Sequence, residues 1–425
     1  MLPSDTKTQP SYGSALIVLT SLFFVWGLIT SLNDILVPHF KAIFTLNYVR
    51  AMLIQFCFFG AYFVMSLPSG YLVERLGYRR GIVLGLLVAG SGCLGFYPAA
   101  ALQSYAWFLA ALFVLASGIT LLQVAANPCV ANLGPEESSA SRLNLTQAFN
   151  SLGTTVGPLL GSALILDVGK HASGASKATG EMATVQGPYL ALAGVFCLIA
   201  LVFAQFRLPL AAVGGTGVVG PDELTPAGSL WRQTHLVLGA LAIFVYVGAE
   251  VAIGSFLVSF MAQPAIAGLP ANMAGRYLAL YWGGAMVGRF VGSALLRKIK
   301  GGKVLACNAA SAIALLLVAI ATRGPVAMWA VLAIGLCNSI MFPTIFSLAI
   351  SRLGTRTGEA SGALCMAIVG GAIVPVIMGF CADRSGLSLA FFVPLACYAY
   401  IAHYGLVGHR VRHVAAGDRR QRASA

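Results

Sequence analysis

The sequence predicts an all-α integral membrane protein of about twelve transmembrane helices, arranged as two six-helix halves. Three observations lead to this fold class. Of the 425 residues, 58% are hydrophobic and only 9% are charged, against roughly 25% charged in an ordinary soluble domain. The mean hydropathy is +0.86. Apolar runs recur along nearly the whole chain, and each can cross a hydrocarbon core of ~30 Å, which takes about 20 helical residues.

The apolar runs follow one another with short polar breaks, as expected of successive membrane-spanning helices. Taken in order, they predict helices over residues 15–38, 48–73, 80–100, 105–131, 141–167, 187–207, 234–261, 273–297, 303–322, 325–351, 358–382 and 387–408. Within these runs, only Asp34, Glu250 and Arg289 are charged residues that fall clearly away from helix ends.

The longest polar interruption, PLAAVGGTGVVGPDELTPAG, covers residues 209–228 near the middle of the chain. Its glycines and prolines favour a linker. We therefore predict an N-terminal six-helix half over 1–207, a cytoplasmic linker over 208–232, a C-terminal six-helix half over 233–410 and a cytoplasmic tail over 411–425.

The formal net charge of +13 follows from topology. With both termini in the cytoplasm, 18 Lys and Arg residues fall on cytoplasmic segments and 7 on outer segments, as the positive-inside rule requires. We expect a multi-pass protein of the cell inner membrane with both termini cytoplasmic, surrounded by the lipid bilayer and monomeric. The positive charge does not call for a nucleic-acid partner.

The cysteines and histidines give no sign of a metal site or a cofactor. All nine cysteines lie in apolar segments without a CxxC pair, and the six histidines are scattered. Such cysteines behave as small buried apolar residues. We expect no metal and no cofactor.

Three short matches indicate an internal repeat. FVW at Phe24 returns as FVY at Phe244, GYLVER returns as GSALLR, and GTTVGP returns as GGAIVP. The two members of each match are separated by nearly the same offset, about half the length of the chain. In addition, GYLVERLG resembles GFCADRSG on the opposite face, as in inverted repeats nested within halves. Proteins built in this way bind substrate near the membrane midplane.

Two levels of family resemblance follow from longer motifs. GYLVERLGYRR resembles the loop 2–3 signature of the major facilitator superfamily, G-x-L-x-D-R-x-G-R-R, with Glu74 and Tyr78 departing from it. SLNDILVPHFK, VAANPCVANLGPEESSASRLNLTQAFNSLG, YVGAEVAIGSFL and MFPTIFSLAISRLG resemble the fucose–galactose–glucose:cation symporter family. The resemblance implies twelve helices in two pseudo-symmetric halves.

The same resemblance separates the sugar branches. The L-fucose members carry an Asp in N-D-I-L and a Glu just before V-A-A-N-P. Asp34 matches the first, but Gln123 stands at the second position. A Gln there, together with the Glu of YVGAE, is similar to the glucose/galactose branch.

Asp34 and Glu250 are the predicted ion-coupling residues. Asp34 precedes Pro38 by four residues, so its carbonyl loses its intrahelical donor, and we expect the helix to bend or end there. The alternative is a helix-end residue wetted at the outer interface. Glu250 lies within an apolar helix, where a carboxylate must be paired, protonated or reached by water. It could bind the ion, accept sugar hydroxyls or form a structural pair with Arg289.

A set of polar and aromatic residues could line a sugar site. Amides offer donors and acceptors without net charge, which suits the hydroxyls of a sugar ring. Gln123 and Asn127 share one helix face at i, i+4 spacing. The alternative is hydrogen bonding between helices. The predicted substrate-binding residues are Asn33, Gln123, Asn127, Asn144, Gln147, Asn150, Tyr246, Glu250, Trp282 and Asn338.

A third group is predicted to control opening. Glu74, Arg75, Arg79 and Arg80 at the end of the second helix would form a charge latch between transport states, although a topological role explains the arginines equally well. Arg289 belongs to the same gating group, with snorkelling to the cytoplasmic surface as its alternative.

Together these features predict a secondary transporter that imports a neutral hexose, glucose or galactose, by symport with H⁺ or Na⁺ through alternating access. The alternatives are an L-fucose:proton symporter, or a uniporter or sensor on the same fold. An enzyme is not expected, because the membrane segments hold few titratable residues and no clustered histidines.

Overall fold

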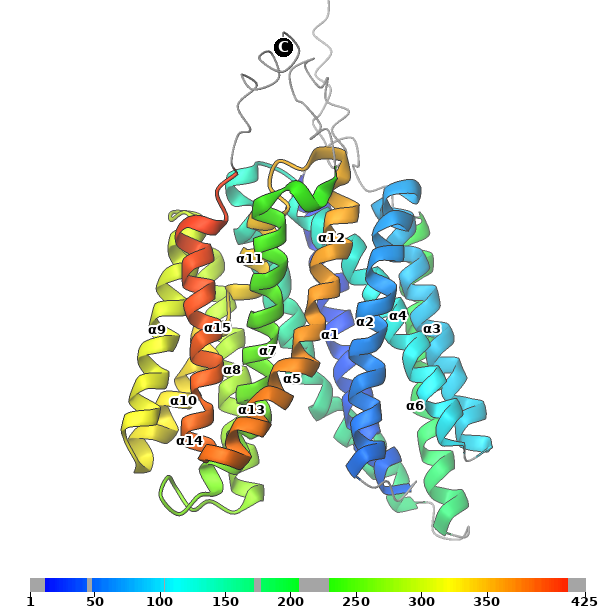
Figure 1. Ribbon diagram of the computed structural model, residues 1–425. Coiled ribbons are helices and arrows are strands. Elements are labelled where there is room, and N and C mark those ends of the chain that lie inside the picture. The colour runs from blue at the N-terminus through cyan, green and yellow to red at the C-terminus, as the bar shows by residue number, and fades with distance from the viewer. Residues whose placement is uncertain (1–11, 44–47, 103, 172–176, 206–228, 412–425) are drawn as a thin grey trace, which may run out of the picture.

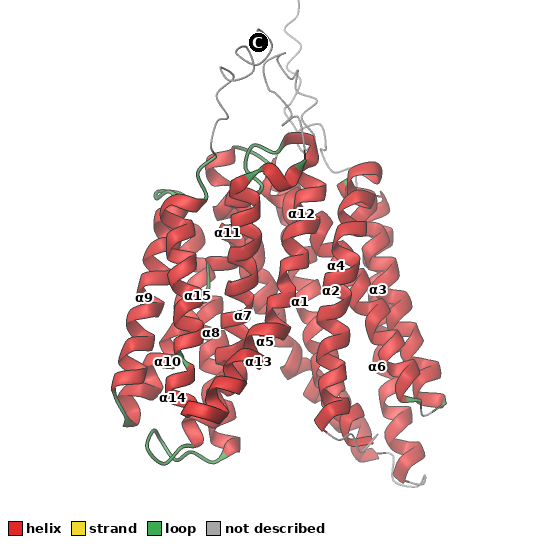
Figure 2. Ribbon diagram, in the orientation of Figure 1, coloured by secondary structure: helices red, strands yellow, loops and turns green. Residues whose placement is uncertain are grey.

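The computed structural model describes residues 12–43, 48–102, 104–171, 177–205 and 229–411. Within these ranges the chain is helical and contains no β-strand (Figure 2). The first half consists of α1 (Tyr12–Ile43), α2 (Tyr48–Leu76), α3 (Tyr78–Ala101), α4 (Tyr105–Ala131), the 3-10 turn η1 (Glu136–Ser138), α5 (Ser139–His171) and α6 (Lys177–Gln205). These six helices correspond to the first six predicted spans.

The second half begins with three uninterrupted helices and ends with three interrupted ones. The turn η3 (Leu230–Arg232) leads into α7 (Thr234–Ala262), α8 (Ala271–Leu295) and α9 (Gly301–Ala321). The tenth span is α10 (Gly324–Asn338) and α11 (Met341–Ala349). The eleventh is η4 (Gly354–Arg356), α12 (Thr357–Met366), η5 (Ala367–Val369) and α13 (Gly370–Ser385), and the twelfth is α14 (Leu387–Ala390), α15 (Phe392–His403) and the π-helical turn η6 (Tyr404–Gly408).

All twelve predicted spans are therefore helical, which confirms the fold class. Within the described ranges, eight segments are long and apolar enough to cross a membrane on length and composition. The three interruptions were not predicted. Each is followed by a proline in the first turns of the next helix, namely Pro343, Pro375 and Pro394. Proline removes one helical N–H and crowds the carbonyl four residues earlier. At Pro343 and Pro394 that carbonyl belongs to Ser339 and Ala390, which lie at the breaks themselves.

The first helix was expected to bend or end near Pro38, and it does not end there, because α1 continues to Ile43. The fixed φ of proline is compatible with a helix, and in a membrane protein the freed carbonyl can be satisfied by neighbouring groups. The side chains of Asn33 and Asp34 lie outside the described residues.

The internal repeat predicted from sequence is present as a repeated contact. A Cβ placed on Gly153 of α5 would lie 2.1 Å from the carbonyl oxygen of Phe24 in α1. A Cβ on Gly370, which begins the matching motif of the second half, would lie 2.0 Å from the carbonyl oxygen of Phe244 in α7. Only glycine permits so close an approach of two helix backbones. The two halves therefore contain the same close contact between their first and fifth helices.

The two halves meet at one end of the bundle, which we call the closed end. It comprises the first turns of α5 and α12 and the last turns of α8 and α11. Ser141 Oγ donates to the Ser293 carbonyl at 2.7 Å, and Ser347 Oγ donates to Ser139 Oγ at 2.9 Å. In Figure 1, α12 runs beside α2 near the top, whereas its continuation α13 swings away from α2 toward the bottom.

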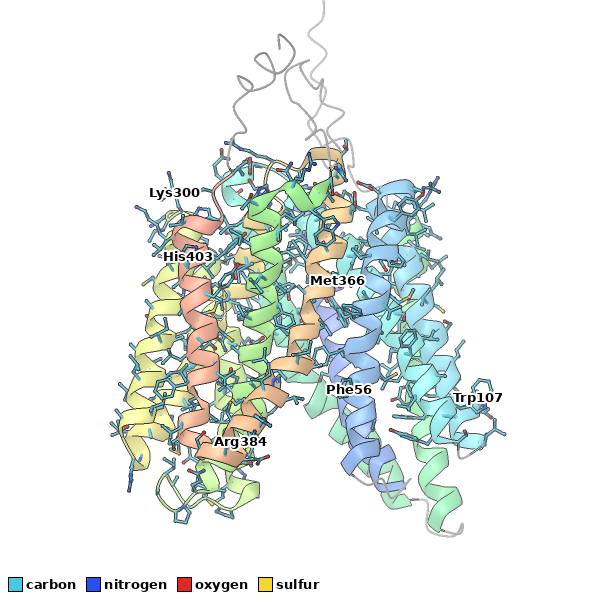
Figure 3. All side chains as sticks on the ribbon, viewed as in Figure 1. Phe56, Trp107, Lys300, Met366, Arg384 and His403 are labelled. Carbon is cyan, nitrogen blue, oxygen red and sulfur yellow. The ribbon has the colours of Figure 1, made fainter. Side chains whose placement is uncertain are left out.

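The labelled side chains of Figure 3 show which charges lie at which end. Lys300 and His403 lie toward the closed end, whereas Arg384 lies toward the opposite end. Lys300 belongs to the segments expected in the cytoplasm and Arg384 to those expected outside, so the two ends of the bundle separate these charges as the topology requires.

Candidate functional site

In the N-terminal half, α4 presents two buried amides. Tyr62 of α2 donates its hydroxyl to Gln123 Oε1 at 2.9 Å. Gln147 of α5 donates to Asn127 Oδ1 at 3.4 Å, and Asn127 Nδ2 is buried without a partner. The predicted shared face of Gln123 and Asn127 is thus turned into the helix bundle.

In the C-terminal half, three tyrosines surround Asn338 at the end of α10. Asn338 Nδ2 donates to Tyr281 at 2.8 Å, and Tyr398 donates to Asn338 Oδ1 at 2.6 Å. Tyr246 donates to the Asn338 carbonyl at 3.1 Å. Tyr281 in turn donates to the backbone carbonyl of Glu250 at 3.3 Å. This network joins α7, α8, α10 and α15.

The two arrangements occupy similar positions of the repeat. Tyr62 and Tyr281 lie on the second helix of their respective halves, and Gln123 and Asn338 lie on the fourth. The offset within each of these two pairs is close to the offset of the repeated motifs. Each amide is hydrogen-bonded to its tyrosine. Each half therefore contributes one tyrosine–amide pair at a similar place in its helices.

A proline stands five residues after each of these amides and frees a backbone carbonyl. Pro128 cannot donate to the carbonyl of Val124, which instead accepts Ser361 Oγ at 2.8 Å from the other half. Pro343 cannot donate to the carbonyl of Ser339, which accepts Arg289 Nε at 3.1 Å. In both cases a side chain from another helix replaces the missing donor.

Glu250 lies half-buried in the middle of α7. Its Oε1 atom is buried and has no hydrogen-bond partner. The charge of Arg289 is close enough to attract it, but the recorded hydrogen bonds of Arg289 go to the Ser339 carbonyl and to Ser151 Oγ. Arg289 thus reaches across to α5 instead of snorkelling to the surface.

Asn144 and Asn150 hold α5 against its neighbours. Asn144 Nδ2 donates to the Ala140 carbonyl at 2.8 Å and to Thr344 Oγ1 at 3.2 Å. Asn150 Nδ2 donates to the Phe23 carbonyl of α1 at 3.0 Å. The bonds to Thr344 and Phe23 are of the interhelical kind that the sequence left as the alternative.

Exposure divides the predicted sugar-site residues into two groups. Asn127, Asn144 and Asn338 are 0% exposed, so in this conformation they contact only protein. Gln123 and Gln147 retain 7%. Asn150 and Glu250 are half-buried.

The aromatic side chains of this region also differ in their exposure. Tyr246 is 1% exposed, whereas Trp282 is 45% exposed. The Trp282 ring lies edge-on to Tyr281 with 5.2 Å between centroids. Of Tyr246 and Trp282, only Trp282 has an exposed side chain.

The predicted latch residues separate in the structure. The Arg75 guanidinium lies over the Tyr71 ring of its own helix at 4.2 Å. Arg79 donates to the carbonyls of Phe203, at 3.1 Å, and Ala204, and so caps the last turn of α6. Arg80 is exposed. These arginines serve the N-terminal half itself.

Glu74 is the member of this group that faces the other half. Its charge interacts with those of Glu359 and Arg356 at the start of α12, which are themselves paired at 2.9 Å. Nearby, a Cβ on Gly70 would lie 2.9 Å from the Gly358 carbonyl. The α2–α12 contact is therefore a backbone contact with charges at its rim.

Several residues of this region were missed by sequence reasoning. Tyr62 carried a usable signal, since Tyr281 has a similar place in the second half of the repeat. Tyr398 and Ser361 carried none, because their partners lie 60 and 237 residues away. Within the described ranges, no group of three or more His, Cys, Asp or Glu side chains could hold a metal ion.

Helices of this number, arranged as two repeated halves with polar groups buried between them, define a multi-pass membrane transporter fold. The model of the Major Facilitator Superfamily matches residues 16–368. The chain belongs to the major facilitator superfamily.

Individual proteins are also similar to this chain over most of its length. A glucose/galactose transporter of Brucella abortus biovar 1 (strain 9-941) is 57% identical over 409 residues, which is 96% of this chain and 97% of that protein. An L-fucose-proton symporter of Escherichia coli (strain K12) is 37% identical over 413 residues, 93% of each chain. The crystal structure of the transporter FucP in the outward conformation superposes with a TM-score of 0.84 at 36% identity, over 93% of this chain and 99% of that one.

Proposed function

We propose that this protein imports a neutral hexose, glucose or galactose, by symport with H⁺ or Na⁺ in the bacterial inner membrane. The observation that carries the proposal is the tyrosine–amide pair repeated in the two halves, Tyr62–Gln123 and Tyr281–Asn338. Tyr281 also donates to the backbone carbonyl of Glu250, whose Oε1 atom is unpaired. Hydroxyls and amides both donate and accept, so they match an uncharged polyol. The 57% identity to a glucose/galactose transporter supports the same sugars.

Transport would proceed by alternating access. The closed end is taken as the cytoplasmic end, because the Lys- and Arg-rich segments lie there. Hexose would enter from the opposite end, and the halves would then rock about the central site. Glu74 and Arg289, which face the other half, are proposed to stabilise the conformation in which the cytoplasmic end is shut. Arg75, Arg79 and Arg80 are proposed to contribute to gating only through the N-terminal half that they contact.

Coupling to a cation is assigned to Asp34 and Glu250. A carboxylate within the membrane can bind a proton or a sodium ion. If the cation and the sugar each stabilise the conformation that the other prefers, the gradient of the cation drives sugar uptake. The described side chain of Glu250 supports this role, since its Oε1 is buried and unpaired.

The sugar would contact the groups that have surface available, together with those that position them. Gln123, Gln147, Asn150, Glu250 and Trp282 are proposed to face it. The aromatic ring of Trp282 suits the apolar C–H face of a pyranose. Asn33, which is next to Asp34 in the sequence, is proposed to lie beside the sugar. The buried residues Asn127, Asn144, Tyr246 and Asn338 are proposed to position the residues that contact the sugar.

A second candidate is L-fucose:proton symport, favoured by the 37% identity to an L-fucose-proton symporter. The Gln at position 123 argues against it, because the fucose members that this chain resembles carry a carboxylate there. The hexose assignment therefore stands first. No catalytic step is proposed, and the transporter is proposed to act as a monomer.

The test is uptake of labelled glucose into proteoliposomes under an inward proton gradient, an inward sodium gradient or neither. Wild type is compared with Asp34→Asn, and with Asp383→Asn as a matched control, since Asp383 is exposed near the end of α13. We expect one gradient to drive accumulation, and Asp34→Asn to abolish accumulation but retain sugar exchange.

Two results would contradict the proposal in different ways. If glucose equilibrates regardless of either gradient, the protein is a facilitator and is not coupled to a cation. No movement of labelled glucose or galactose by folded protein would remove the hexose assignment, and labelled L-fucose would then be tested.

A further inference from the structure

Arg289 joins three segments of the protein, one of which belongs to the opposite half. It lies on α8 in the C-terminal half. Its Nε donates to the Ser339 carbonyl in the break between α10 and α11, and its Nη1 donates to Ser151 Oγ on α5 of the N-terminal half. It is half-buried and attracted to Glu250.

The Ser339 contact belongs to the C-terminal half itself. Pro343 leaves the Ser339 carbonyl without its helical donor, and a Cβ on Gly288 would lie 2.5 Å from Ser339 Oγ. The neighbouring residue Arg289 is therefore held against the break whatever the two halves do.

The Ser151 contact behaves differently, because it crosses between the halves. Ser151 Oγ also donates to the Gln147 carbonyl one turn earlier, which fixes the hydroxyl for Arg289. This contact can exist only while α5 lies against α8. The same helix pair is joined again by Ser141 and Ser293 nearer the closed end.

Glu250 completes the arrangement. A buried carboxylate oxygen without a partner is costly, and a nearby guanidinium is its natural partner. Here the guanidinium is engaged elsewhere. The carboxylate interacts with the Tyr246 hydroxyl, and its Oε1 atom has no hydrogen-bond partner.

We propose that Arg289 is a positioning residue that exchanges partners during transport. While the closed end is shut, Ser151 holds the guanidinium away from Glu250, which is then free to bind the sugar or the coupling cation. When the closed end opens, α5 leaves α8, the guanidinium turns to Glu250 and the ligand is displaced into water. If that ligand is a proton, water accepts it. This inference rests on the proposed hexose transport.

The test uses equilibrium binding of D-glucose and D-galactose to purified protein. Ser151→Ala frees the guanidinium to pair with Glu250, so we expect hexose affinity to fall about tenfold or more, the size of one charge-assisted hydrogen bond of ~1.5 kcal/mol. Ser151→Thr keeps the hydroxyl and should retain wild-type affinity. Ser141→Ala loosens the same helix pair without touching Arg289, and affinity should change less than about threefold.

A double variant identifies the cause. Arg289→Gln removes the competing charge but can still donate to the Ser339 carbonyl, so adding it to Ser151→Ala should restore affinity. Equal effects of Ser151→Ala and Ser141→Ala would overturn the inference, because Ser151 would then be an ordinary contact between the halves. A loss not restored by Arg289→Gln, in protein that elutes as folded, would also overturn it.

The same binding measurements separate a failure of this inference from a failure of the proposed hexose transport. If wild type binds neither hexose, the proposed function fails and the inference fails with it. If wild type binds hexose and Ser151→Ala and Ser151→Thr both bind it with wild-type affinity, only the role of Arg289 fails.

Discussion

Tyr398→Phe is expected to destabilise the protein more than Tyr400→Phe on the same helix. Tyr398 donates to Asn338 Oδ1 at 2.6 Å, and Asn338 is 0% exposed. Phenylalanine would leave this amide oxygen buried with no donor. An unsatisfied buried group costs ~1–3 kcal/mol, whereas interhelical hydrogen bonds in membranes average about 0.6 kcal/mol with a maximum near 1.7. Because Tyr398 is fully buried, we expect its substitution to cost an amount toward the upper end of these ranges. The free energy of unfolding should fall by ~1–2 kcal/mol.

Tyr400→Phe is a matched control. Its hydroxyl is partly exposed and donates to the Leu238 carbonyl at 3.1 Å. That carbonyl lies inside α7, where the helix supplies its own donor, so we expect a loss of about 0.6 kcal/mol or less. Reversible unfolding in mixed micelles, followed by circular dichroism, would give both free energies. Equal losses, or no loss for Tyr398→Phe, would refute the claim that Tyr398 holds Asn338.

Two further substitutions test the joints of the fold. Gly370→Ala would place a Cβ 2.0 Å from the Phe244 carbonyl oxygen, so the free energy of unfolding should fall by ~1–3 kcal/mol, as in an overpacked core. Gly194→Ala is the control, because a Cβ there would meet nothing within 4 Å. It should be neutral or stabilising in the same unfolding assay. Ser361→Ala removes the 2.8 Å donor to the Val124 carbonyl in the other half, so the closed end should open roughly threefold more often, for a bond of about 0.6 kcal/mol. Spin-label distances across the closed end would measure this, and an unchanged distribution would contradict it.

The twelve spans could be predicted from sequence because the length of an apolar run is a physical requirement of the bilayer. The interruptions could not, because a proline alone does not decide them. Pro343 lies beside a break, yet Pro128 lies inside the unbroken α4 and Pro38 inside the unbroken α1. The carbonyls freed by Pro128 and Pro343 accept from Ser361 and Arg289, which lie on distant helices.

The candidate site was predictable where local spacing places residues together. Gln123 and Asn127 share a face because they are four residues apart. The partners of these residues come from packing between distant helices, which no local pattern records. The bond between Ser151 and Arg289 joins residues 138 apart, and it required the structure.

The prolines at equivalent places in the repeat also constrain protein engineering. Stabilised variants of membrane proteins are often sought by raising helix propensity, and Pro128→Ala would be an obvious choice. The alanine N–H would then compete for the Val124 carbonyl that now accepts Ser361 from the opposite half. A better helix would thus mean a weaker link between the halves. Thermostability screens on this transporter should therefore score turnover together with melting temperature, since a gain at this site would be obtained at the expense of the conformational cycle.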